Sequence, residues 1–309
     1  MTEPAAGPQP DPPPVITARP VARPACMPTS APPAPPVEAV APLPQSPVPD
    51  DAAAPRPLSA LEFPGVARRD AALDLALVLL VALVIPFGFD ILAVVMVAGP
   101  AELGFDPAPI LTLRKWFDGL LVLSLAGYLV WRQHIPAAAL GLRTDGVGGQ
   151  LLWAPLTLCG VGAIFLITVF GISALIILFP ELRRDVMRRT EFIEMLPTGS
   201  LPRAVLLLVP VAIHEELLFR GLLIPYLRRL GASWPAAVLM STAVFAVLHL
   251  AQGWLGVMQV FGIGLALGTC FVLSRSLLAV TIAHFLFNLA QFQLAHYVYP
   301  WLQKLPQGG

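Results

Sequence analysis

Apolar residues fill most of the chain from about residue 70 onward, in long runs separated by short polar or glycine-containing segments. A helix needs about 20 mostly apolar residues to cross a membrane. On this criterion the runs predict about seven transmembrane helices, and therefore an all-α, polytopic transmembrane helical bundle. The predicted helices cover residues 73–97, 113–131, 151–179, 203–227, 234–251, 254–273 and 277–296.

The first 60 residues have a different composition. They contain 19 of the 34 prolines in the chain, together with many alanines and few aromatic residues. Such a segment cannot bury enough apolar surface to offset the entropy lost on folding. We therefore expect a disordered, Pro-rich N-terminal tail over residues 1–60, followed by N-terminal transmembrane helices over residues 61–139.

The overall composition supports the membrane interpretation. Hydrophobic residues make up 57% of the 309 residues, charged residues only 12%, and the mean hydropathy is +0.76. These values are typical of an integral membrane protein in contact with lipid. The 19 basic and 19 acidic residues balance, so net charge does not favour a nucleic-acid partner. The alanine- and arginine-rich composition indicates a bacterium, and we expect a multi-pass protein of the inner membrane.

One apolar run contains three charged residues close together. Glu215, Glu216 and Arg220 lie within the predicted helix 203–227. Glu216 and Arg220 are four residues apart and share a helical face, where they can form an ion pair that braces the region. Glu215 lies about 100° further round the helix and lacks that partner. Ionisable residues at membrane depth are costly and usually mark a functional site.

Two later runs also contain isolated polar residues. Glu215 lies 16 residues before the turn at Gly231 and His249 lies 18 residues after it, so two antiparallel helices would place them at similar depth. His284 and Asn288 are four residues apart on the last run and share one helical face. The same count of residues places His284 and Asn288 at a shallower depth than the other two.

A carboxylate, two imidazoles and a carboxamide in one pocket are suited to hydrolysis. Glu215 can take a proton from water as a general base, and His249 can hold and polarise that water. His284 and Asn288 can donate hydrogen bonds to the oxyanion of a tetrahedral intermediate.

A metal site is the alternative chemistry for the same residues. Glu215, His249 and His284 are all possible ligands of a divalent ion such as zinc, although we favour a route without a cofactor. The segment that begins at His214 superficially resembles the zinc motif His-Glu-x-x-His, but Leu218 occupies the second ligand position. We therefore interpret His214 as a polar packing residue or as a residue that supports a site residue from behind. The three cysteines lack any Cys-x-x-Cys spacing and indicate neither a disulfide framework nor a thiolate metal site.

The ordered motifs resemble those of a known family. Glu215-Glu-x-x-x-Arg220, Phe-x-x-x-His249 and His284-x-x-x-Asn288 occur in the order found in the CPBP intramembrane proteases, which include the Rce1-like CAAX proteases. The resemblance covers about residues 140 to 292. It predicts a catalytic transmembrane domain over residues 140–296 and a short C-terminal tail over residues 297–309.

The resemblance implies an intramembrane glutamic endopeptidase that acts on membrane-associated proteins or peptides. It implies that Glu215 activates water together with His249, and that the last of the three motifs forms the oxyanion site. It also places Glu216 and Arg220 among the residues needed for the integrity of the site.

Functions other than proteolysis are compatible with the same fold. The chain is alternatively a non-proteolytic membrane scaffold, an immunity-type protein or a transporter subunit. A transporter typically contains internal repeats or matching broken helices in two halves, and the sequence shows no persuasive repeat. A scaffold would keep its activity after the substitution Glu215→Gln, whereas a protease would lose it.

Overall fold

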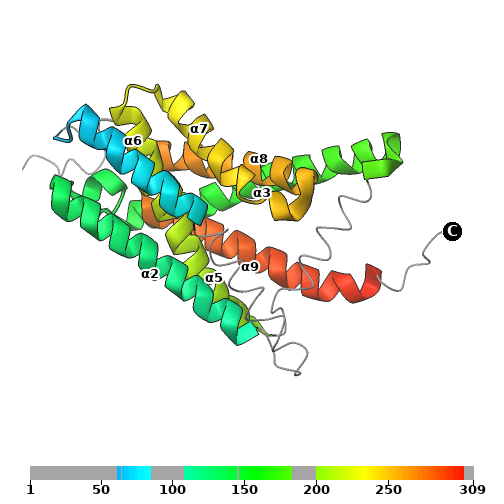
Figure 1. Ribbon diagram of the computed structural model, residues 1–309. Coiled ribbons are helices and arrows are strands. Elements are labelled where there is room, and N and C mark those ends of the chain that lie inside the picture. Colours follow the sequence, from blue (N-terminus) through cyan, green and yellow to red (C-terminus); the bar gives the residue numbers. More distant parts are fainter. Residues whose placement is uncertain (1–60, 64, 85–107, 145, 183–199, 303–309) are drawn as a thin grey trace, which may run out of the picture. The chain divides into compact units, whose positions relative to one another are not determined.

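The fold was analysed in a computed structural model, which describes residues 61–63, 65–84, 108–144, 146–182 and 200–302 (Figure 1). These residues all belong to one compact unit, Ala52–Gly309. Every regular element in the described part of the chain is a helix, which confirms the all-α prediction. The predicted tail over residues 1–60 lies outside the described residues.

The first described helix covers residues 68–84. It is followed by α2 (Ala108–Gln133), η2 (Ala137–Leu140), α3 (Val147–Leu178), η3 (Pro180–Leu182), α5 (Leu201–Glu216), η4 (Leu217–Leu223), α6 (Ile224–Arg229), α7 (Trp234–Val247), η5 (Leu250–Gln252), α8 (Gly253–Ser274) and α9 (Leu277–Leu302). The predicted helix 203–227 is therefore divided, because η4 is a π-helical segment between two α-helices. The last helix continues to Leu302 and includes the first residues of the predicted C-terminal tail.

Three helices in the described part of the chain are long and apolar enough to cross a membrane. They cover Val147–Leu178, Leu250–Ser274 and Leu277–Leu294, and the shorter apolar helix Trp234–Val247 accompanies them. α5 has only 16 residues before the π-helical segment begins. The structure thus agrees with an integral membrane protein and supports three of the predicted crossings by length and composition.

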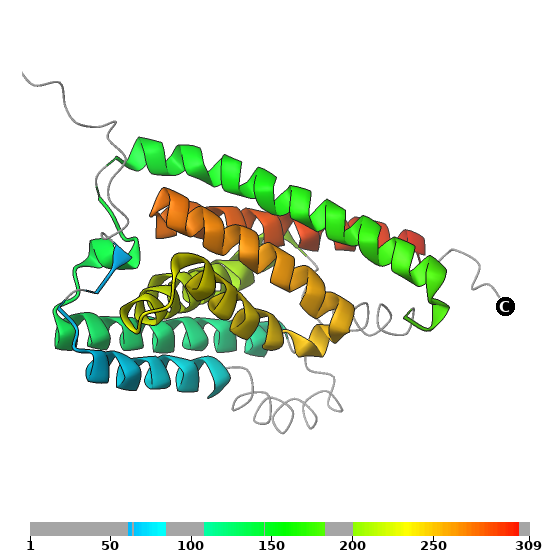
Figure 2. The same ribbon diagram turned by 90° about the horizontal axis from the view of Figure 1, so that it is seen from above.

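The helices pack in a small number of pairs (Figures 1 and 2). α3 packs against α8 and α9, α7 against α8, and α5 against both α2 and α9. Glycines on α8 allow close approach, because a Cβ atom on Gly262 would lie 2.9 Å from Ile164 of α3. On another face of α8, a Cβ atom on Gly268 would lie 2.9 Å from Val238 of α7. Small residues of this kind are typical of helix interfaces in membranes.

A proline determines how α2 sits against α5. Pro210 has no backbone N–H, so the carbonyl of Leu206 has no partner from its own helix. The indole Nε1 of Trp116 on α2 donates a hydrogen bond to this carbonyl at 3.0 Å. Further along, a Cβ atom on Gly119 would lie 3.5 Å from the Cβ of Pro210. From the first contact to the second, the residue number increases along both helices, so α2 and α5 run parallel.

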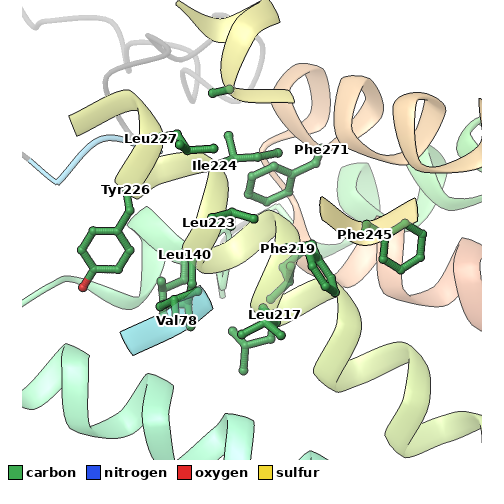
Figure 3. Close-up of a cluster of buried hydrophobic side chains, with 14 of the residues drawn as sticks. Val78, Leu140, Leu217, Phe219, Leu223, Ile224, Tyr226, Leu227, Phe245 and Phe271 are labelled. Carbon is green, nitrogen blue, oxygen red and sulfur yellow. The ribbon is translucent and has the colours of Figure 1, made fainter. Parts of the chain in front are cut away.

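Apolar side chains bury the π-helical segment and the start of α6 (Figure 3). All seven residues from Leu217 to Leu223 are buried. Their core neighbours include Leu140 of η2 and Phe271 of α8. The backbone that directly follows the two glutamates is therefore surrounded by packed side chains, which hold it in place.

A buried carboxylate connects the first helix to this core. The side chain of Asp74 is fully buried and accepts hydrogen bonds from Arg132 Nη1 at 2.7 Å and Gln133 Nε2 at 2.8 Å, both at the end of α2. It accepts a third from the hydroxyl of Tyr226 in α6 at 3.2 Å. Asp74 thus joins three helices, two of which precede the predicted catalytic domain.

Candidate active site

The two adjacent glutamates are the last residues of α5, immediately before the π-helical segment. The side chain of Glu216 is fully buried, whereas that of Glu215 keeps 16% of its surface exposed. π-helical turns often occur at functional sites, where they alter the direction in which side chains point. The adjacent carboxylates therefore differ in environment, although both belong to one short segment.

Glu216 is held by two partners through a single carboxylate oxygen. Arg220 Nη1 donates to Glu216 Oε1 at 2.9 Å, which confirms the predicted ion pair. His284 Nδ1 lies 2.7 Å from the same oxygen. Because an ionised carboxylate only accepts hydrogen bonds, Nδ1 is the donor and carries the proton. The second oxygen, Oε2, has no hydrogen-bond partner among the described residues.

Arg220 links the site to two further helices. Its side chain is 1% exposed, and Nη2 donates to the carbonyl of Gly264 in α8 at 3.1 Å. The guanidinium lies 4.7 Å from the centre of the Phe245 ring in α7, a cation–π contact. Three interactions therefore compensate for the burial of this charge.

Glu215 faces the other side of the His284 ring. The distance from His284 Nε2 to Glu215 Oε2 is 3.7 Å, so this imidazole lies between the two carboxylates. Glu215 also interacts electrostatically with His249 and with His214. The structure therefore brings Glu215, Glu216 and the two predicted catalytic histidines into one cluster.

His284 lies at the level of the glutamates and not at the shallower depth expected from counting residues. A Cβ atom on Gly221 would lie 3.6 Å from Leu277 Cδ2, so α9 begins beside the π-helical segment. The antiparallel course of α9 then brings His284 back to Glu216. The expected depth difference was wrong because helix packing, and not the distance from the preceding turn, determines the height of α9.

His249 lies just after α7, at the start of η5. Its Nδ1 lies 2.8 Å from the carbonyl of Phe245, which can only accept, so Nδ1 carries the proton and Nε2 keeps a lone pair. The Phe245 ring contacts the rings of both catalytic candidates, with centroid distances of 4.6 Å to His249 and 6.3 Å to His284. Sequence reasoning treated Phe245 only as a motif position and missed this central contact.

Asn288 and His214 are neighbours of cluster residues along the chain. Asn288 is half-buried one turn after His284, and no hydrogen bond joins it to Glu215, His249 or His284 in the described part of the chain. His214 is 3% exposed, and its Nδ1 bonds the carbonyl of Pro210 at 2.7 Å. That bond agrees with the prediction of a polar packing residue.

A divalent ion is the alternative use of Glu215, His249 and His284. In the segments that the structure describes, no group of three or more His, Cys, Asp or Glu side chains is placed to hold a metal ion. Both ring nitrogens of His284 already face carboxylates.

The fold and the site define an integral membrane protein with a carboxylate–imidazole cluster on helices of its apolar bundle, a combination suited to hydrolysis. Residues 197–290 match the family model described as "Rce1-like: Type II CAAX prenyl endopeptidase Rce1-like". The segment that carries all three motifs is thus similar to this CAAX protease family, and the resemblance is confirmed over these residues. The chain matches no curated protein and no solved structure.

Proposed function

We propose that this protein is an intramembrane endopeptidase that hydrolyses peptide bonds of membrane-associated proteins or peptides with water activated by Glu215. The observation that carries the proposal is the unequal pairing of the two acids. Glu216 is paired with Arg220 and accepts a hydrogen bond from His284, whereas Glu215 has no Lys or Arg partner among the described residues and keeps an exposed surface. Glu215 is therefore the carboxylate that can meet water.

The first step is attack of water on the scissile carbonyl carbon. Glu215 takes a proton from the water as its oxygen forms the new C–O bond, and the carbonyl oxygen becomes an oxyanion. His249 accepts a hydrogen bond from the same water through the lone pair on Nε2, because its Nδ1 donates to Phe245. The water is thus oriented by two groups from different helices.

The second step is collapse of the tetrahedral intermediate. The hydrogen bond from His284 Nδ1 to Glu216 fixes the orientation of the ring, so Nε2 faces Glu215. The proton taken up by Glu215 passes to the leaving nitrogen, either directly or through His284 Nε2, and the C–N bond breaks. In this proposal Asn288 donates to the oxyanion, and His284 does so once its Nε2 carries the proton from Glu215; both residues lie on one face of α9.

Substitution of Glu215 tests the proposal. Glu215→Gln keeps the shape of the side chain but cannot take a proton, so cleavage of a membrane-inserted reporter peptide should fall at least 100-fold. The abundance and the melting temperature of the purified variant should stay close to those of the wild type. The matched variant Glu216→Gln, unlike Glu215→Gln, should lower the melting temperature, because Arg220 then keeps a buried charge without a carboxylate partner.

Retention of cleavage by Glu215→Gln would overturn the proposed mechanism. Absence of cleavage by the wild type on a broad set of membrane peptides, with biological activity unchanged in Glu215→Gln, would instead favour a non-proteolytic scaffold of the same fold.

A further inference from the structure

One hydroxyl group of α7 contacts the backbone of the π-helical segment, and the proposed mechanism does not use it. Ser241 is 2% exposed, and its Oγ donates a hydrogen bond to the carbonyl of Phe219 at 2.7 Å. A serine inside a helix commonly donates to a carbonyl of the preceding turn of its own helix. The Ser241 hydroxyl instead joins α7 to the segment that directly follows the two glutamates.

The π-helical segment depends on contacts with neighbouring helices. π-helical turns are rare and short in proteins, so the surrounding structure has to hold such a turn in place. Phe219 is the third of the seven residues in this segment. Its ring also meets the ring of Phe245 in α7 edge-on, with a centroid distance of 5.0 Å (Figure 3). A backbone contact and a ring contact therefore attach the same residue to α7.

Ser241, Phe245 and His249 follow one another at intervals of four residues, along α7 and the turn after it. This spacing places them on one side of the helix. Phe245 contacts the guanidinium of Arg220 in the π-helical segment at 4.7 Å, and the ring centres of Phe245 and His249 are 4.6 Å apart. One side of α7 thus has the contact with Phe219 at one end and the candidate catalytic imidazole at the other.

On the basis of the proposed function, we infer that Ser241 is a positioning residue for the hydrolysis. Its hydrogen bond to Phe219 fixes how far α7 lies along the π-helical segment, and thereby where His249 lies relative to Glu215. Phe219 follows Glu215 by four residues on one continuous helical backbone, and Ser241 precedes His249 by eight, roughly 12 Å along the axis.

The proposed mechanism makes this position important for the rate. Glu215 and His249 have to hold the same water molecule, and they belong to two different helices. A displacement of about 1 Å between catalytic groups can lower a rate about 100-fold. The hydrogen bond of Ser241 opposes such a displacement, because a shift of α7 along its axis would break it.

Substitution of two adjacent residues tests the inference. Ser241→Ala removes the hydroxyl group. For a membrane-inserted reporter peptide, kcat per folded molecule should fall at least tenfold, whereas KM should stay within about twofold. Thr242→Val is the matched control, because Thr242 is also 2% exposed but its methyl group faces Gly264 of α8. Its kcat should stay within about twofold of the wild-type value.

Amide hydrogen exchange tests the same contact without catalysis. In detergent, the amides of Leu217–Leu223 should exchange about fivefold faster in Ser241→Ala than in the wild type, since one buried hydrogen bond is lost. The exchange of α3 should not change, and Thr242→Val should leave both segments as they are. Mass spectrometry of proteolytic peptides measures these rates.

Unchanged kcat in Ser241→Ala would overturn the positioning role and leave the proposed function intact, provided that the wild type cleaves the reporter. An equal loss of kcat in Thr242→Val would also overturn it, because the effect would then not depend on the contact with Phe219. If the wild type cleaves no reporter, the proposed function fails, and exchange decides the remaining part of the inference. Faster exchange confined to Leu217–Leu223 supports the role of Ser241 in holding this segment, and unchanged exchange overturns it.

Discussion

The chemistry of the site depends on how single charged residues are paired. Glu216, Arg220 and His284 form a buried cluster. The carboxylate of Glu216 pairs with the guanidinium of Arg220 and accepts a hydrogen bond from the ring of His284. Such a cluster adds little stability when it is intact, but it is costly to break, because the remaining charge stays buried. In the part of the chain that the structure describes, Glu215 has no Lys or Arg partner, so it can change its protonation state without breaking the Glu216–Arg220 pair.

At this scale we predict the effect of removing the buried cation. Arg220→Met should lower the free energy of unfolding by about 3–5 kcal/mol, because Glu216 then keeps a buried charge. Thermal unfolding of purified protein in detergent measures the change. Arg203→Met, at an exposed position, should stay within about 0.5 kcal/mol. Equal stability of Arg220→Met and Arg203→Met would contradict the assigned role of the ion pair.

At the scale of the elements, the site is assembled by close contacts between helices. α8 approaches α7 at Gly264 and Gly268, where Cβ atoms would lie 3.1 Å from Phe245 and 2.9 Å from Val238. This approach allows the carbonyl of Gly264 to accept from Arg220. Because Gly264 and Gly268 have no side chains, α7 can lie close to α8. This close packing sets the position of α7, and of His249 just after it, relative to α5.

The α7–α8 contact gives a prediction for Gly268. Gly268→Ala adds a methyl group that overlaps the Val238 side chain, and overpacking of this kind costs about 1–3 kcal/mol. Thermal unfolding should show the loss, and Val238→Ala in the same chain should restore most of it. Gly162→Ala in α3 is the matched control, since nothing lies within 4 Å of its added atom. It should be neutral or slightly stabilising in a helix, and a similar loss at both positions would argue against overlap as the cause.

At the scale of the whole molecule, helices outside the matched family segment support the site. The family model covers residues 197–290, whereas Asp74 and Arg132 lie before it. Their network reaches Tyr226, which follows the π-helical segment by three residues. The N-terminal helices therefore contribute to the position of the segment that carries the glutamates.

Two aspartates on the first helix provide the corresponding test. Asp74→Asn should lower the free energy of unfolding by about 3 kcal/mol, since a fully buried carboxylate with three donors is lost and Arg132 loses its close partner. Asp70→Asn should change it by less than about 1 kcal/mol, because Asp70 is 42% exposed and 3.9 Å from the same Arg132. Unfolding of both variants in detergent compares the two. Similar losses would mean that burial of Asp74 is not the cause.

Local patterns in the sequence were sufficient for the fold class, and they supplied the candidate site residues. The apolar runs predicted the helices, because a chain in lipid must satisfy its backbone hydrogen bonds internally. The Glu216–Arg220 pair followed from a spacing of four residues, which any helix converts into proximity. The three motifs and their order indicated the family before any geometry was known.

Tertiary packing decided the local helix type and the side-chain neighbours in the site, which the spacing of residues along the chain could not. The 3.6-residue period of an α-helix does not predict the π-helical segment after Glu216. The wider turn of that segment depends on the core that surrounds it. The place of His284 between two carboxylates depends on where α9 starts beside Gly221. Sequence alone therefore supplied the candidate residues, because their types and spacing are local properties, whereas contacts between distant helices decided which of them face one another.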